Sequence, residues 1–179
     1  MIIQTERLTI RPIVEGDWER LLEIIRDFAV SPYARYDQPL PQEPDRVRDM
    51  AKRWEKATRE ETCFFFAVIL DGDMIGYIVF HPTDDAYDCG YCFHSAAQGK
   101  GYALESLSAL IHAFLKRGVR CFTAGTAIAN TPSVRLLTRL GFQKMGEEKV
   151  SFYQDDSGSP IYFAGGLYQK EWKEIDETA

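Results

Sequence analysis

The spacing of apolar side chains changes several times along the chain, and each change indicates a new element of secondary structure. Residues 8–11 alternate between apolar and polar, which is the two-residue period of a strand. Two almost uniformly apolar runs, residues 63–70 and 74–80, flank an Asp-Gly-Asp turn typical of a β-hairpin. By the same criteria, further strands are predicted at residues 87–94, 119–127, 142–153 and 161–168.

Helical spacing of apolar residues separates these strands. Helices are predicted over residues 18–28, 47–54 (a short one), 103–117 and 131–140. Asp17 is positioned to cap the first helix and Gly118 to end the third. Thr131 is predicted to cap the fourth, ahead of Pro132 in its first turn. Between the first two helices, the prolines of residues 31–45 predict an irregular segment.

The order of these elements is strand, two helices, three strands, helix, strand, helix and two strands. Hairpin strands followed by a strand-helix-strand crossover predict an α/β fold, with one mixed, largely antiparallel sheet and helices on both sides. The count of strands is about seven. No repeat or linker divides the chain, so residues 1–179 are predicted to form a single domain.

The composition excludes several classes of partner. With 21 basic and 27 acidic side chains the net charge is -6, which argues against nucleic-acid binding and is compatible with a cationic amine. Hydrophobic residues make up 45% of the chain, yet no apolar run approaches the roughly 20 residues of a membrane-spanning helix. We therefore expect a cytoplasmic protein that binds neither nucleic acid nor membrane.

The sequence Cys89-Gly90-Tyr91-Cys92 has the spacing of a redox or zinc motif. It lies in a predicted strand, however, where residues three apart point to opposite faces. No second cysteine pair accompanies it, and the three histidines are scattered at His81, His94 and His112. Ordinary reduced cysteines are therefore expected, and no metal site.

The segment with the most chemical information is the glycine loop, defined here as residues 98–103 (Gln-Gly-Lys-Gly-Tyr-Ala), between a strand and a helix. Gly99 and Gly101 allow backbone N–H groups to converge at a helix N-terminus, which is how a pyrophosphate is bound, and Lys100 adds a charge. The alternative is an unliganded loop entering a helix. A dinucleotide fingerprint would need a third glycine where Leu104 stands, and no Walker sequence is present.

At this point the sequence resembles the GNAT superfamily of N-acetyltransferases. The pattern Gln98-x-x-Gly101-x-Ala103 is similar to that family's Q/R-x-x-G-x-G/A signature. The similar segments follow the family's order and resemble most its ribosomal-protein alanine N-acetyltransferase branch. They are residues 5–12, 101–106, 130–133, 140–142 and 171–172.

The resemblance implies a fold whose fourth and fifth strands splay apart to hold acetyl-CoA, with no metal. The glycine loop would bind the pyrophosphate, and a strand edge would pair with the pantetheine arm. The implied cofactor residues are Cys92, Phe93, His94, Gln98, Gly99, Lys100, Gly101, Tyr102, Ala103, Asn130 and Ser133.

The resemblance also implies catalytic roles. Many relatives have a tyrosine acid where this chain has Leu137, and Ser133 is the implied substitute; the alternative is that Ser133 serves only the helix N-terminus. Asp88 is the candidate base, or else a solvated carboxylate at the strand end, and His94 is a weaker candidate. A backbone N–H near Phe93 is the candidate oxyanion donor.

The expected reaction is transfer of the acetyl group of acetyl-CoA to a primary amine, by direct attack in a ternary complex. The amine is a protein N-terminus or a small molecule, and the alternative is a non-catalytic acyl-CoA-binding module or sensor. The acceptor is expected to enter between residues 31–45 and the final hairpin. Candidate lining residues are Tyr33, Tyr36, Asp155 and Asp156. The sequence leaves a homodimer open.

Overall fold

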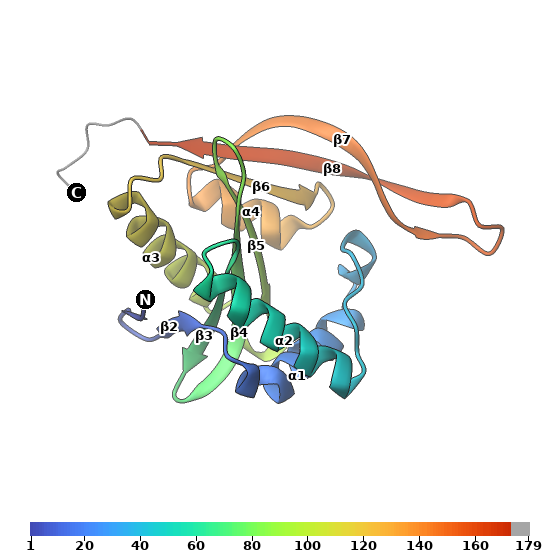
Figure 1. The fold of residues 1–179 in the computed structure, drawn as a ribbon. Coiled ribbons are helices and arrows are strands. Elements are labelled where there is room, and N and C mark those ends of the chain that lie inside the picture. Colours follow the sequence, from blue (N-terminus) through green and yellow to red (C-terminus); the bar gives the residue numbers. More distant parts are fainter. Residues whose placement is uncertain (173–179) are drawn as a thin grey trace.

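The computed structural model describes residues 1–172, which form a mixed sheet covered by helices on both faces (Figure 1). The strands are β1 Ile3–Gln4, β2 Thr9–Pro12, β3 Phe64–Leu70, β4 Asp73–Pro82, β5 Tyr87–Phe93, β6 Cys121–Ala127, β7 Gln143–Gln154 and β8 Pro160–Glu171. The α-helices are α1 Trp18–Ala29, α2 Pro44–Arg59, α3 Tyr102–Lys116 and α4 Thr131–Arg139. Short 3₁₀ turns occupy Glu15–Asp17, Ala34–Tyr36 and Ser95–Ala97.

The eight strands lie in the order β1-β2-β3-β4-β5-β6-β8-β7, and every neighbouring pair is antiparallel except β5 and β6. The predicted mixed, largely antiparallel sheet is confirmed. The predicted count of seven strands is one too low, because β1 has two residues and is too short for an alternating pattern. Helix α2, predicted to be short, has 16 residues because its polar turns continue to Arg59.

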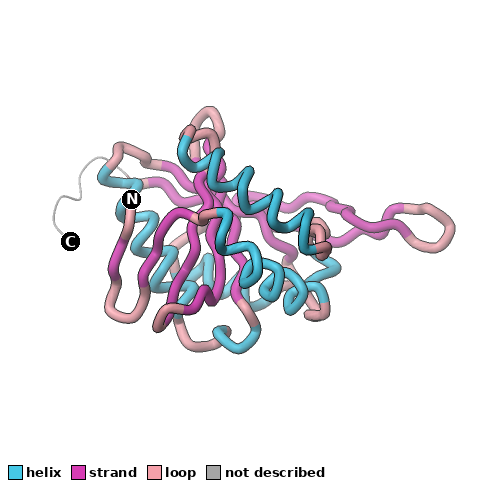
Figure 2. The backbone as a smooth tube through the Cα atoms, turned by 60° about the horizontal axis from the view of Figure 1, so that its bottom comes forward, coloured by secondary structure: helices cyan, strands magenta, loops and turns pink. Residues whose placement is uncertain are grey.

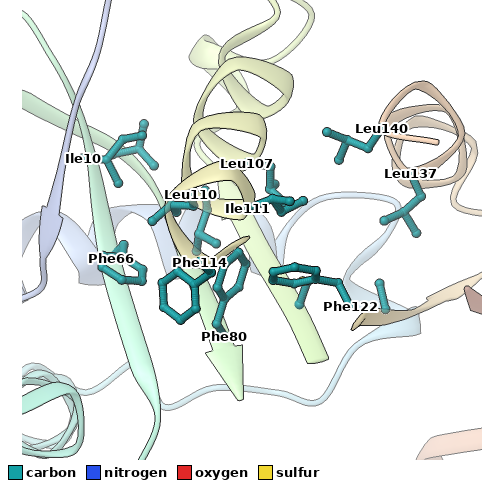
Figure 3. Close-up of a cluster of buried hydrophobic side chains, with 14 of the residues drawn as sticks. Ile10, Phe66, Phe80, Leu107, Leu110, Ile111, Phe114, Phe122, Leu137 and Leu140 are labelled. Carbon is teal, nitrogen blue, oxygen red and sulfur yellow. The ribbon is translucent and has the colours of Figure 1, made fainter. Parts of the chain in front are cut away.

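Each face of the sheet has its own apolar core. On one face, α1 and α2 bury residues such as Leu21, Ile24 and Val47 against the sheet. On the other face, α3 places Phe114 among the strand side chains Phe66, Phe80 and Phe122, as Figure 3 shows. The Phe80 and Phe114 ring centroids are 4.9 Å apart, in the edge-to-face arrangement that aromatic rings prefer.

Two predicted helix caps are wrong in detail. Asp17 does occupy the position before α1, but its carboxylate accepts hydrogen bonds from Arg11 at 2.7 Å and from the Val14 N–H at 2.9 Å, not from the helix. Asn130 caps α4 in place of Thr131, because its side chain accepts a hydrogen bond from a backbone N–H of the first turn. The amide oxygen therefore satisfies a donor that has no partner within the helix.

The parallel pair β5 and β6 is joined only at its beginning. The two strands are in register at Tyr87 with Phe122 and at Asp88 with Thr123, and no further pair follows. Beyond Asp88 they diverge, which confirms the splay implied for the fourth and fifth predicted strands. On the far side of β6, β7 and β8 form a long hairpin that projects beyond the rest of the protein (Figures 1 and 2).

None of the helices within residues 1–172 is both long and apolar enough to cross a membrane.

Candidate active site

A cavity of about 610 Å³ opens where β5 and β6 separate. Its walls come from β5, the glycine loop, β6, α4, the segment after α1 and the β7–β8 hairpin. Its lining includes Tyr33, Tyr36, Asp88, Tyr91, Cys92, Phe93, Gln98, Gly99, Gly101, Tyr102, Ala103, Asn130 and Ser133. Segments distant in sequence thus meet around one space, and most of the predicted site residues line it.

The glycine loop has the backbone shape that its sequence predicts. Gly99 and Gly101 have φ angles of +73° and +84°, in the left-handed region that residues with a side chain rarely adopt. Gly101 immediately precedes α3, a helix of 15 residues whose N-terminal dipole favours an anion. A Cβ built at Gly99 would meet no other atom within 4 Å, so the described chain leaves the loop uncovered at this residue.

An ion pair fastens the N-terminal segment to this loop. Arg7 and Glu105 approach to 2.6 Å, and Arg7 also donates a hydrogen bond to the Lys100 carbonyl at 3.0 Å. Thr5 donates to the same carboxylate at 2.6 Å. Partial burial opposes ionisation of Glu105, but these hydrogen bonds and the Arg7 charge outweigh it and lower its pKa. Glu105 therefore braces the loop, and it does not line the cavity.

The edge of β5 that faces the splay is set by its pairing with β4. The His94 N–H donates to the Ile75 carbonyl at 3.0 Å, so at this residue the backbone faces β4. Because backbone groups alternate in an antiparallel ladder, those of Phe93 face the opposite way, toward the cavity. The Phe93 carbonyl accepts a hydrogen bond from the Gln98 side chain at 2.9 Å. Phe93 is thus oriented to offer its N–H to a ligand, whereas His94 is not.

A hydrogen bond between two side chains connects the N-terminus of α4 to β5. Asn130 Oδ1 accepts a hydrogen bond from the Ser133 N–H at 3.3 Å, so the amide of Asn130 serves the helix end. The Ser133 hydroxyl lies 2.7 Å from the Tyr91 hydroxyl. Burial raises the pKa of Tyr91 to about 12, although the hydrogen bond with Ser133 acts to lower it. The Ser133 hydroxyl therefore contacts Tyr91, while the backbone N–H of Ser133 takes part in the cap of α4.

Asp88 lies at the closed end of the splay, the last position where β5 and β6 pair. Its carboxylate accepts a hydrogen bond from the Thr123 hydroxyl at 3.0 Å. Although the carboxylate is accessible, the surrounding walls desolvate it and raise its pKa, while Thr123 and the charge of His81 act in the opposite direction. A carboxyl group with a raised pKa that lines a cavity is suited to accept a proton.

Comparison with known proteins agrees with this geometry. Residues 7–143 match the family described as "Acetyltransferase (GNAT) domain". The chain belongs to the GNAT acetyltransferase family.

Individual relatives align with almost the whole length of this GNAT protein. It is 28% identical to the uncharacterized N-acetyltransferase YnaD of Bacillus subtilis, over 96% of this chain and 99% of that protein. Its fold is similar to the ribosomal-protein-S5-alanine acetyltransferase from Vibrio fischeri, with a TM-score of 0.79, 19% identity and coverage of 98% and 99%. A ribosomal L7/L12 alpha-N-protein acetyltransferase in complex with coenzyme A gives a TM-score of 0.81, 19% identity and coverage of 96% and 98%.

The end of the cavity beside the hairpin is aromatic. We call it the aromatic end, and it comprises Phe28, Tyr33, Tyr36, Phe152 and Phe163. Tyr36 and Phe163 meet edge-to-face with ring centroids 5.3 Å apart. Next to them the Tyr153 hydroxyl donates to the Ala34 carbonyl at 3.2 Å, which ties the segment after α1 to the hairpin.

Four predicted site residues lie elsewhere. Asp155 and Asp156 belong to the hairpin turn and do not line the cavity; Asp155 accepts hydrogen bonds from the turn residues that follow it. The His94 side chain faces Asp27, with 3.7 Å between Nε2 and Oδ1, and its Nδ1 accepts from the Ala96 N–H. His94 and Lys100 line a separate small hollow of about 90 Å³. Their side chains are therefore absent from the main cavity.

The two cysteines of the C-x-x-C sequence lie on opposite faces of the sheet, as the two-residue period of a strand predicts. Cys89 packs in the core beneath α3, whereas Cys92 packs on the α1–α2 side. The four cysteines, all within the described residues, are free thiols. Burial raises the pKa of Cys92 to about 12, so its thiol is not prepared to act as a nucleophile.

Several cavity residues were missed from the sequence. Arg135 and Arg139 follow Pro132 at helical spacing on α4, and that spacing could have indicated them. Tyr91 precedes Phe93 by two residues on one face of β5, and strand period could have indicated it. The acidic residues Asp37 and Glu148 gave no signal, because a surface loop and an edge strand normally carry such side chains.

Proposed function

We propose that this GNAT acetyltransferase transfers the acetyl group of acetyl-CoA to a primary amine by direct attack within a ternary complex. The observation that carries the proposal is a single cavity whose two sides differ in their lining. One side is bordered by the glycine loop and the N-terminus of α4, and the other is the aromatic end. Such a cavity suits two ligands whose reactive atoms meet where β5 and β6 diverge.

The distribution of charge supports two ligands of opposite sign. Helix α4 presents Arg135 and Arg139 to the cavity, and within residues 1–172 neither takes part in an ion pair. Asp88, Asp37 and Glu148 come from β5, the segment after α1 and β7. Cations favour the phosphates of a coenzyme A ester, and carboxylates favour a protonated amine.

The glycine loop fits the co-substrate by its donor set. N–H groups at Gly99, Gly101, Tyr102 and Ala103 would hold the pyrophosphate, and free space above Gly99 leaves room for it. The edge of β5 at Phe93 would pair with the pantetheine arm, as an added strand pairs with a sheet. Acetyl-CoA supplies an activated thioester carbonyl.

Three groups of the chain would assist the transfer. Asp88 accepts the proton of the amine, directly or through water, because desolvation has raised its proton affinity. The Phe93 N–H donates to the carbonyl oxygen as negative charge develops there. The Ser133 hydroxyl donates a proton to the departing sulfur, since Leu137 occupies the position of the usual tyrosine. Leu137 is fully buried in the core, and it has no proton to give.

The acceptor class follows from the aromatic end and its acidic neighbours. A positively charged amine next to an apolar group would contact both aromatic rings and carboxylates there. Two structural neighbours are named as acetyltransferases of ribosomal proteins, which supports a protein N-terminus as one candidate acceptor. A small-molecule amine has the same recognition chemistry and is the second candidate.

The test is a panel of amines incubated with acetyl-CoA and the purified protein, with products identified by mass spectrometry. One arm holds tetrapeptide amides that begin with alanine or serine, and the other holds putrescine and spermidine. An acetylated product that depends on the protein supports the proposal and identifies the acceptor class. Binding of acetyl-CoA without any acetylated product contradicts it, and indicates a module that binds the ester without turnover.

A further inference from the structure

The Ser133 hydroxyl does not accept the hydrogen bond that caps its own helix. In many helices a hydroxyl near the first turn accepts a backbone N–H. In α4 that role belongs to Asn130, whose side chain accepts the hydrogen bond from the Ser133 N–H. The side chain of Ser133 is therefore available for another contact, and it lines the cavity.

The hydroxyl of Tyr91 makes that contact. Tyr91 lies on β5, and its ring packs against the core on the α3–α4 side, together with Tyr87 and Phe93. From there its hydroxyl reaches across the splay to Ser133, at 2.7 Å, over a sequence separation of 42 residues. This hydrogen bond joins β5 to α4 at the wall of the cavity, where β5 and β6 are not paired.

Each of these two hydroxyls has one proton. A phenol is the more acidic group, so it is the better donor, and the favoured arrangement has Tyr91 donating to the Ser133 oxygen. The proton of Ser133 is then directed away from Tyr91. Burial keeps the phenol protonated, since the pKa of Tyr91 is about 12. The tyrosine therefore remains protonated, and able to donate, near neutral pH.

We propose that Tyr91 is a positioning residue for acetyl transfer: its hydroxyl donates to Ser133 and thereby orients the Ser133 proton toward the sulfur of the co-substrate. The inference rests on the proposed function. Tyr91 itself does not touch the reacting atoms. Ser133 supplies the proton that a tyrosine at position 137 would supply directly, and Tyr91 holds Ser133 in place from β5.

The amine, which binds as a cation, first releases one proton to solvent. Its neutral nitrogen then forms a bond to the carbonyl carbon, and the bond between that carbon and sulfur breaks, with its electron pair leaving on sulfur. The amine loses one proton to Asp88, and the sulfur receives one proton from Ser133. The Ser133 oxygen, which keeps the hydrogen bond from Tyr91, then recovers a proton from water, and Asp88 returns its proton to that water, so both groups regain their starting protonation. No oxidant, reductant or metal is consumed.

A double-mutant cycle tests the inference, with acetyl-CoA and the tetrapeptide or polyamine that the acceptor panel identifies. Ser133→Ala is expected to lower kcat by about 100-fold, as loss of a general acid does. Tyr91→Phe is expected to lower kcat by roughly 10-fold without changing KM for acetyl-CoA, because orientation is lost and binding is not. In the Ser133→Ala background, Tyr91→Phe is expected to change kcat by less than about twofold.

Tyr87→Phe is the matched control. Tyr87 lies on the same strand and packs on the same core, yet among residues 1–172 its hydroxyl has no hydrogen-bond partner, and it does not line the cavity. It should retain the wild-type kcat. A loss below about threefold in Tyr91→Phe, or a loss of equal size in both backgrounds, overturns the inference. A wild-type protein that binds acetyl-CoA but acetylates no amine overturns the proposed function, and this inference with it.

Discussion

Replacing glycines by alanine inside and outside the glycine loop distinguishes an effect on binding of the co-substrate from an effect on stability of the fold. Gly99, Gly101 and Gly118 all have a positive φ angle, of +73°, +84° and +91°. An L-residue in that conformation costs about 1 kcal/mol, so each variant should lose about that much stability, or roughly 2–4 °C in Tm. Gly99 and Gly101 line the cavity, whereas Gly118 follows the far end of α3 and does not.

The three variants should therefore differ in affinity, measured by calorimetric titration with acetyl-CoA. A loop that relieves its strain turns N–H groups away from the pyrophosphate. Each hydrogen bond lost to a charged ligand is worth about 1.5–3 kcal/mol, which predicts a roughly 10- to 100-fold rise in Kd for Gly99→Ala and Gly101→Ala. Gly118→Ala should bind like the wild type.

Thermal unfolding without ligand provides the internal control, because it should report a similar loss for all three. The reasoning is refuted if Gly118→Ala weakens binding as much as the loop variants do. It is also refuted if Gly99→Ala and Gly101→Ala keep the wild-type Kd, since the loop N–H groups would then have no part in binding.

Three other changes have defined outcomes. Glu105→Gln should lower the free energy of unfolding by about 1 kcal/mol at pH 7. The pKa of Glu105 is below its usual 4.5, so the wild-type advantage in stability should disappear as the pH falls through that lowered pKa. Urea titrations of the two proteins at several pH values measure this. Asp88→Asn should lower kcat by about 100-fold or more. Desolvation raises the pKa of Asp88 above 3.8, and the acid limb that this group gives the wild-type pH–rate profile should be lost in the variant. An unchanged acid limb would exclude Asp88 as the base. Tyr36→Ala should raise KM for the amine by roughly tenfold and leave KM for acetyl-CoA unchanged, whereas Tyr162→Ala, on the exposed part of the hairpin, should change neither.

The fold was predictable where side-chain period and turn chemistry act locally. The alternation at residues 8–11, the hairpin around Gly72 and the helical stripe that includes Phe114 depend on neighbours in the sequence, and the structure has each element there. Strand β1 was not predicted, because two residues are too few to show an alternation of apolar and polar side chains. The cap of α4 was assigned one residue too late, because Asn130 and Thr131 are both good capping residues and only the backbone geometry distinguishes them.

The shape of the candidate site was predictable where local sequence determines the main-chain conformation. The sharp turns at Gly99 and Gly101 follow from the sequence, because glycine adopts their positive φ angles without strain. The contact of Tyr91 with Ser133 was not predictable, because it joins residues 42 positions apart across a gap in the sheet. His94 was assigned to the wrong side for the same reason: whether its backbone faces β4 or the splay depends on the register with Ile75.

We propose that acetyl-CoA lies between β5 and β6, and filling that gap tests this placement most directly. Gly125 lines the cavity from β6, and Gly146 lies on β7 outside it; a Cβ at either position would meet no atom within 4 Å. Calorimetric titration with acetyl-CoA should therefore show binding by the wild type and by Gly146→Trp, and a loss of binding by Gly125→Trp. Undiminished binding by Gly125→Trp, or no binding by the wild type, would contradict the account.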